Sequence, residues 1–140
     1  MPKTKIKFKI ATLERVTYQD EIDQLTVCTE SGEITVMARH APLVSILKPG
    51  ELRIKKDGQT VVLAVSTGFL EIRQNSEVYV LADSADRAEE IDVEAAKAAR
   101  RRAEDLLKEK QNRTDFDFAK LQAIINRETA KLKIANKYRK

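Results

Sequence analysis

"LRIKKDGQTVVLAV", residues 52–65, decides the fold of the first part of the chain. Two runs rich in apolar and β-branched residues flank Asp57-Gly58. An Asp-Gly pair between such runs is a strong signal for a two-residue hairpin turn, because both residues tolerate the positive φ angles that this turn requires. The stretch therefore predicts an antiparallel β-hairpin.

Further short strands are predicted on both sides of this hairpin. In "KIKFKI", residues 5–10, Ile6, Phe8 and Ile10 alternate with lysines, as in a strand with one buried face. Other β-branched runs, separated by turn residues, are "QLTVCT", "EITVMA", "GFLEIR" and "EVYVLA". Many short strands without a helical period between them favour an antiparallel β-sandwich or flattened barrel, which we place at residues 1–86.

The pattern changes to a helical one after Ala82. Residues 92–110 are mostly Ala, Lys, Arg, Glu and Leu without Gly or Pro, and Asp92 is a candidate N-cap. "QNRTD", residues 111–115, interrupts the run, and Thr114 with Asp117 resembles a capping pair for a second helix. One apolar stripe is predicted on that helix: Phe118, Leu121, Ile125, Leu132 and Ala135. We therefore predict an antiparallel α-helical hairpin at residues 87–140 and an α+β fold class.

The charge is divided unevenly between these two parts. Residues 1–96 carry 12 Lys and Arg against 16 Asp and Glu, whereas residues 97–140 carry 14 against 6. Two helices of about 20 residues are marginal in water by themselves. The basic hairpin must therefore dock on the sandwich, on a partner, or on each in turn.

The residue inventory argues against catalysis. Cys28 and His40 are the only cysteine and histidine, so no internal disulfide can form and a zinc site is disfavoured. Cys28 lies in a predicted strand, where a buried structural thiol is the preferred interpretation over a Cys-His nucleophile. No glycine-rich phosphate-binding motif and no apolar run long enough to span a membrane is present.

Two blocks of the sequence resemble a known family. "SGEITVMARHAPLVSILKPGELRI", residues 31–54, and "GFLEIRQNSEVYVLADSADRAEEID", residues 68–92, are similar in order and spacing to the epsilon subunits of rotary F-type ATP synthases. The resemblance covers essentially the whole chain. It implies a non-catalytic central-stalk subunit that couples ion flow to ATP synthesis.

The resemblance also implies partners and a location. The sandwich would bind the gamma subunit and the ring of c subunits. The helical arm would extend toward the alpha and beta subunits of the catalytic head and inhibit ATP hydrolysis. The protein would meet the membrane only through the complex, at the cytoplasmic face in bacteria or the stromal thylakoid face in plastids.

Candidate contact residues follow from the same resemblance. Glu33, in a Gly-Glu turn, would meet the c subunits, and His40 and Pro42 would shape a loop facing gamma and the ring. A loop histidine without a special partner remains the alternative for His40. Candidates for the inhibitory contacts are Arg100, Arg101, Arg102 and Arg127.

Some bacterial members bind ATP on the folded hairpin, through an Ile/Leu-Asp-x-x-Arg-Ala motif. Here the motif reads "IDVEAA", residues 91–96, with Ala95 at the arginine position. The resemblance nominates Asp86, Ile91, Asp92, Ala96, Arg102, Arg127 and Lys131 for this site. Because a strong guanidinium donor is missing, we expect ATP to bind weakly or not at all, and Asp92 to act as an N-cap. No cofactor is expected.

Two alternatives to a stalk subunit stay open. The first is a nucleic-acid-binding module that uses the basic helices, although these lack aromatic residues for base stacking. The second is an ATP-sensing protein without a rotor partner. We expect no nucleic-acid partner.

Overall fold

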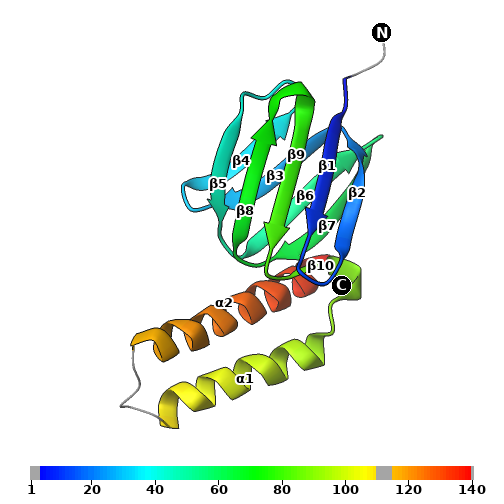
Figure 1. Ribbon diagram of the computed structural model, residues 1–140. Helices are drawn as coiled ribbons and strands as arrows, with labels where there is room; N and C mark the ends of the chain where they lie inside the picture. The colour runs from blue at the N-terminus through cyan, green and yellow to red at the C-terminus, as the bar shows by residue number, and fades with distance from the viewer. Residues whose placement is uncertain (1–3, 110–114, 140) are drawn as a thin grey trace.

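The computed structural model describes residues 4–109 and 115–139 (Figure 1). Thr114, one half of the predicted capping pair, lies outside these residues. The strands are β1 (Ile6–Ala11), β2 (Val16–Ile22), β3 (Gln24–Thr29), β4 (Gly32–Met37), β5 (Leu43–Leu47), β6 (Gly50–Lys56), β7 (Gln59–Val65), β8 (Gly68–Arg73), β9 (Glu77–Ala82) and β10 (Ala85–Arg87). The helices are η1 (Gln74–Ser76), η2 (Ala88–Glu90), α1 (Val93–Glu109) and α2 (Asp115–Tyr138).

The strands form a β-sandwich that is nearly closed. Their order is β10-β7-β6-β3-β5-β8-β9-β1-β2, with β4 paired to β3 beside this path. The path turns from one layer to the other between β3 and β5, which share a single residue pair, Thr29 with Leu47. At the far end β2 returns to β6, where Lys56 forms an ion pair with Asp20. The predicted sandwich is confirmed.

One strand pair departs from the antiparallel pattern. β1 pairs with β9 in parallel, with Lys7 opposite Glu77 and Lys9 opposite Tyr79. Antiparallel neighbours can be joined by a short turn, whereas β1 and β9 are separated by most of the sandwich sequence. No local turn therefore determines their direction.

The hairpin and the alternation predicted from the sequence are both present. β6 and β7 pair from Lys56 opposite Gln59, and Asp57 and Gly58 take the positive φ angles of 49° and 79°. Along β1 the apolar side chains are buried in the core, and the lysines lie on the opposite, outer face of the strand. The largest core side chains are Ile6, Phe8, Ile10, Ile22, Leu25, Leu47, Leu52, Ile54, Leu63 and Leu70.

The two helices pair with each other below the sandwich, and α2 lies on the side nearer to the strands (Figure 1). Its C-terminal half packs on β6, β7 and η2. Asp92 caps α1 as predicted, because its Oδ1 accepts a hydrogen bond of 3.0 Å from the Ala95 backbone N–H. The N-terminal sandwich is thus followed by a docked helical hairpin.

The predicted stripe on α2 is only partly correct. Leu121 and Ala135 are buried, but Phe118 is 55% exposed. Phe118 lies in the first turn of α2, at the end of the hairpin that projects away from the sandwich (Figure 1). Ile134, which the stripe omits, is 4% exposed because α2 buries a second side against the sandwich.

Candidate functional site

The arm docks on the sandwich through a small apolar surface, which we call the docking cluster. Its members come from β7, the segment before α1, the first residue of α1, and the end of α2: Val62, Ala64, Ala88, Ile91, Val93, Ile134 and Ala135. Three of the seven are alanines, so the apolar area that holds the arm is limited. The sandwich interior is a separate and much larger cluster. The residues that hold the arm are therefore not part of that core.

β7 is the strand that makes this docking possible. Leu63 and Val65 point into the sandwich, whereas Val62 and Ala64 point toward α2. The continuous apolar run at residues 61–65 is the sequence signal for a strand covered on both faces. The hairpin prediction covers this run as a strand, but it does not include the second covered face on which α2 docks.

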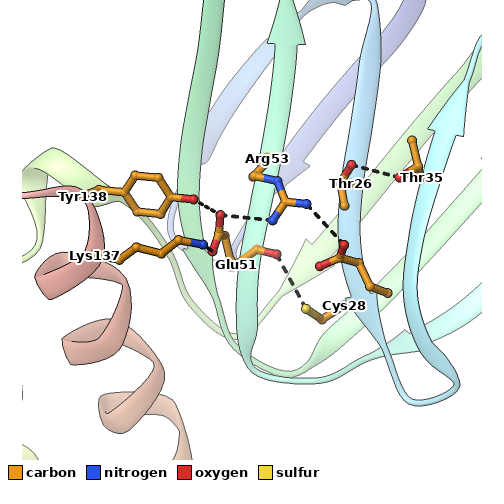
Figure 2. A network of polar contacts seen from close by, with 8 residues as sticks. Thr26, Cys28, Thr35, Glu51, Arg53, Lys137 and Tyr138 are labelled. Atoms are coloured by element: carbon orange, nitrogen blue, oxygen red, sulfur yellow. Dashed lines mark hydrogen bonds and ion pairs between the residues drawn. The ribbon is translucent and has the colours of Figure 1, made fainter.

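A polar contact, the Glu51 latch, holds the last turn of α2 (Figure 2). Glu51 on β6 accepts a hydrogen bond from the Tyr138 hydroxyl at Oε1, and Lys137 Nζ lies 3.1 Å from Oε2. Arg53 Nη1 lies 3.2 Å from the same Oε1. The Glu51 side chain is 13% exposed. Burial opposes its ionisation, but the three donors outweigh burial and hold the pKa of Glu51 below its ordinary value.

Two further polar contacts support the docked arm. Lys131 Nζ lies 3.3 Å from Asp86 Oδ2, and the guanidinium of Arg139 donates to the backbone carbonyl of Ile91. The latch and these contacts all join α2, or Arg139 directly after it, to the sandwich or to the segment that leaves it. Partly exposed ion pairs contribute roughly 0–1 kcal/mol each, so they adjust the docking more than they enforce it.

A second apolar surface lies on the other layer of the sandwich, on the face that points away from the sandwich interior. Ile46, Phe69 and Leu81 are direct cross-strand neighbours on β5, β8 and β9, and Val44 lies two residues from Ile46 on the same face. Their side chains are 46%, 57%, 51% and 70% exposed in that order. We call these four residues the apolar row. An apolar surface of this kind on an ordered sheet is typical of a protein-binding face.

The predicted contact residues of the sandwich lie at opposite ends of β4. Glu33 stands at the start of β4, where Arg53 Nη2 lies 3.2 Å from its Oε1. His40 and Pro42 follow the end of β4, and the His40 ring bonds the Ala41 carbonyl at 2.7 Å. A surface hollow of about 620 Å³ includes His40, Pro42 and the turn before β9. Glu33 and His40 therefore do not form one contiguous site.

The structure brings the nucleotide-site candidates together. A pocket of about 340 Å³ lies between η2, α1 and α2, and Arg127 is the one candidate that does not line it. Its lining residues are Asp86, Glu90, Ile91, Asp92, Ala95, Ala96, Ala99, Arg102, Glu128 and Lys131. Four of these are acidic and two are basic. Lys131 is already paired with Asp86 and Glu128, so the pocket is poorly suited to a triphosphate.

The candidate arginines of the arm are dispersed while the arm is docked. Arg100 Nε lies 3.6 Å from Glu104 Oε1, and Arg101 and Arg102 are exposed on α1. Arg127 Nε lies 3.1 Å from Glu128 Oε1. These charges are available to a partner, but the docked hairpin does not gather them into one surface.

The described residues show neither a metal centre nor a membrane helix. No group of three or more His, Cys, Asp or Glu side chains that could hold a metal ion occurs within residues 4–109 and 115–139. Over the same residues, no helix has the length and apolar character needed to cross a bilayer.

Comparison with known proteins gives two family matches that together span most of the chain. Residues 5–88 match the beta-sandwich domain of the ATP synthase delta/epsilon chain, and residues 89–136 match its long alpha-helix domain. These matches meet within η2, at the point where the strands give way to the helical hairpin.

Close relatives are bacterial ATP synthase epsilon chains. The chain is 44% identical over 121 residues to the protein from Desulforamulus reducens, which covers 86% of this chain and 90% of the relative. It is also 44% identical over 124 residues to the one from Bacillus velezensis, covering 87% and 93%.

Solved structures share the fold at low sequence identity. A chain of the Euglena gracilis mitochondrial ATP synthase superposes with a TM-score of 0.73 at 21% identity, covering 93% of this chain and 81% of that one. A chain from the central stalk and c-ring structure of the Tetrahymena thermophila enzyme gives 0.58 at 13% identity, with 98% of each chain covered.

Proposed function

Because the chain belongs to the delta/epsilon chain family of ATP synthases, we propose that it is a non-catalytic subunit of the central stalk whose arm regulates ATP hydrolysis. The single observation that carries the regulatory part is the shallow docking of a basic helical arm on a complete sandwich. An element with few contacts in its docked position can be shifted by a partner that makes more contacts with it in a second position.

The sandwich would serve as the fixed platform. We assign the apolar row to binding the gamma subunit, because two subunits that rotate together need an interface of appreciable apolar area. The row lies on the layer of β5, β8 and β9, whereas the arm docks on β6 and β7. Gamma and the docked arm can therefore be bound at the same time.

The two ends of β4 would face different neighbours. Glu33 would meet polar groups of the c ring, and the loop with His40 and Pro42 would complete the contact with gamma. The protein would thus be held at the cytoplasmic face of the membrane by its complex alone.

The released arm would act through its charge. Residues 97–140 carry eight more basic than acidic side chains, which favours acidic segments of the beta subunits through charge complementarity. Arg100, Arg101, Arg102 and Arg127 are the proposed contacts. Extension would free Arg127 from Glu128, its neighbour in the docked arm.

ATP would bind the docked arm weakly or not at all. The pocket lacks the motif arginine at Ala95 and contains more acidic than basic side chains. Titration calorimetry of the purified protein with ATP tests this, and tight one-to-one binding would contradict it. Tight binding would also stabilise the docked form, by about 2.7 kcal/mol at a hundredfold excess over the Kd.

Deletion of the arm tests the regulatory proposal. A chain truncated from Asp92 onward should still assemble with the other subunits, and the reconstituted complex should hydrolyse ATP faster than the complex with the full chain. Unchanged hydrolysis after normal assembly would show that the arm is not inhibitory.

Phe69→Glu provides the complementary variant for the platform. Phe69 is 57% exposed, so the full-length variant should fold normally while co-purification with gamma is lost. Retained binding to gamma would rule out the apolar row as the gamma-binding surface.

A further inference from the structure

Arg53 connects two regions of the sandwich to which different roles are assigned above. It projects from β6 and contacts Glu33 with Nη2 and Glu51 with Nη1, each at 3.2 Å. Glu33 belongs to β4, which is separated from β6 by β3. A single guanidinium thus spans three strands and joins the two carboxylates.

Glu51 is also the residue that the arm uses. Figure 2 shows Arg53 and Tyr138 approaching Glu51 from opposite sides, with Lys137 beside Tyr138. Arg53 and Tyr138 donate to the same oxygen, Oε1, while Lys137 binds Oε2. The position of Arg53 therefore bears directly on how well Glu51 can hold the end of α2.

We propose that Arg53 is a positioning residue that couples Glu33 to arm docking, so that a partner's cationic or donor group engaging Glu33 loosens the arm. The identity of that partner as the c ring rests on the proposed function, whereas the coupling is a property of this chain alone. By linkage the effect is reciprocal: release of the arm must alter the affinity of Glu33 for its partner by the same factor.

The direction of the coupling follows from the shared oxygen and from charge. With Glu33 in place, the Arg53 guanidinium divides its donors between two carboxylates. When Glu33 is neutralised or engaged elsewhere, Arg53 has only Glu51 to bind and competes with Tyr138 for Oε1. Its charge, no longer balanced by Glu33, also opposes Lys137. Both effects weaken docking.

The size of the effect follows from exposure. The Arg53 side chain is 29% exposed and that of Glu33 is 53% exposed, so their pair belongs to the weak, solvent-screened class. Loss of the Glu33 charge should therefore increase the undocked population about two- to fivefold. A population shift of this size is small by itself, but in a large complex its effect on arm release would add to the effects of other contacts.

Amide hydrogen exchange of the full-length chain by mass spectrometry tests the coupling without any partner. The reporter is the C-terminal half of α2, and β1 serves as the internal reference. Glu33→Gln should accelerate exchange in α2 about two- to fivefold and leave β1 unchanged. Glu30→Gln is the matched control, because it removes an exposed carboxylate from the turn just before β4 and should have no effect.

The decisive comparison is made in an Arg53→Met background. There Glu33→Gln should produce no further acceleration, because the connecting guanidinium is gone. Arg53→Lys, which keeps the charge but cannot bridge two carboxylates, should behave like Arg53→Met. Thermal melting of each variant establishes that the sandwich stays folded.

Three results would overturn the proposal: no acceleration by Glu33→Gln, equal acceleration with and without Arg53, or equal acceleration by Glu30→Gln. None of these measurements involves gamma, the c ring or ATP hydrolysis. A failure of the coupling is therefore distinguishable from a failure of the proposed function, which the reconstituted complex tests.

Discussion

Ile134→Ala should release the arm while leaving the sandwich intact. Ile134 is 4% exposed and belongs to the docking cluster, where its neighbours on β7 are Val62 and Ala64. The change removes three carbon groups, each contributing about 0.8 kcal/mol when buried. The small neighbours let the arm settle partly into the space, so we take a total of about 2–3 kcal/mol, which shifts the docking equilibrium roughly 30- to 150-fold.

The assay compares two regions of one molecule. In hydrogen exchange, α2 should lose protection in Ile134→Ala, whereas β1 and β9 should keep theirs, because the sandwich core does not include Ile134. Phe118→Ala is the control on the same helix: it removes a larger side chain that is 55% exposed, and it should change α2 exchange less than threefold.

Two outcomes would refute this reasoning. If Ile134→Ala leaves α2 as protected as in the unaltered chain, the docking cluster does not hold the arm. If β1 and α2 lose protection together, the arm and the sandwich unfold as one unit, and the arm is not an independently released element.

Three further predictions concern the latch, the sheet and the pocket. The latch lowers the pKa of Glu51, so its stabilisation of the docked arm is complete above the ordinary value of 4.5 and is lost as the pH falls through the lower pKa of the docked state. Hydrogen exchange of α2, corrected for the intrinsic pH dependence of exchange, should therefore accelerate as the pH falls through this range. In Glu51→Gln this pH-dependent acceleration should be absent. Gly68→Ala should lower the melting temperature, because a Cβ there would lie 2.2 Å from the carbonyl oxygen of Leu81 on the paired strand, and overpacking of this kind costs about 1–3 kcal/mol or more; an unchanged melting temperature would contradict the close packing. Ala95→Arg should tighten ATP binding at least about tenfold in calorimetry by restoring the missing guanidinium, and no change would show that the acidic lining dominates the pocket.

Local signals in the sequence were sufficient for most of the fold. The alternation of Ile6, Phe8 and Ile10 predicts which face of β1 is buried, and Asp57-Gly58 predicts the turn between β6 and β7. Asp92 as the cap of α1 is equally local, because a side-chain oxygen bonds a backbone N–H three residues ahead. The gathering of six nucleotide-site candidates into one pocket was anticipated only through the family resemblance.

The arrangement that carries the regulatory proposals was not readable in this way. Glu51 and Tyr138 are 87 positions apart, and no local pattern in the sequence pairs them. Phe118 and Ile134 have similar apolar character, yet the first is exposed and the second buried, because the sandwich covers only one end of α2.

The sequence by itself determined most of the strands, the buried face of β1, the helical arm and its charge, because side-chain periodicity, turn chemistry and helix propensity act over a few residues. It did not predict β2, β5 and β10. Only the tertiary structure decided that β1 joins β9 in parallel, that β7 is covered on both faces, and that Glu51 holds the arm while sharing Arg53 with Glu33. These features depend on which distant surfaces meet, and that is settled by the packing of the whole chain and not by any short segment of it.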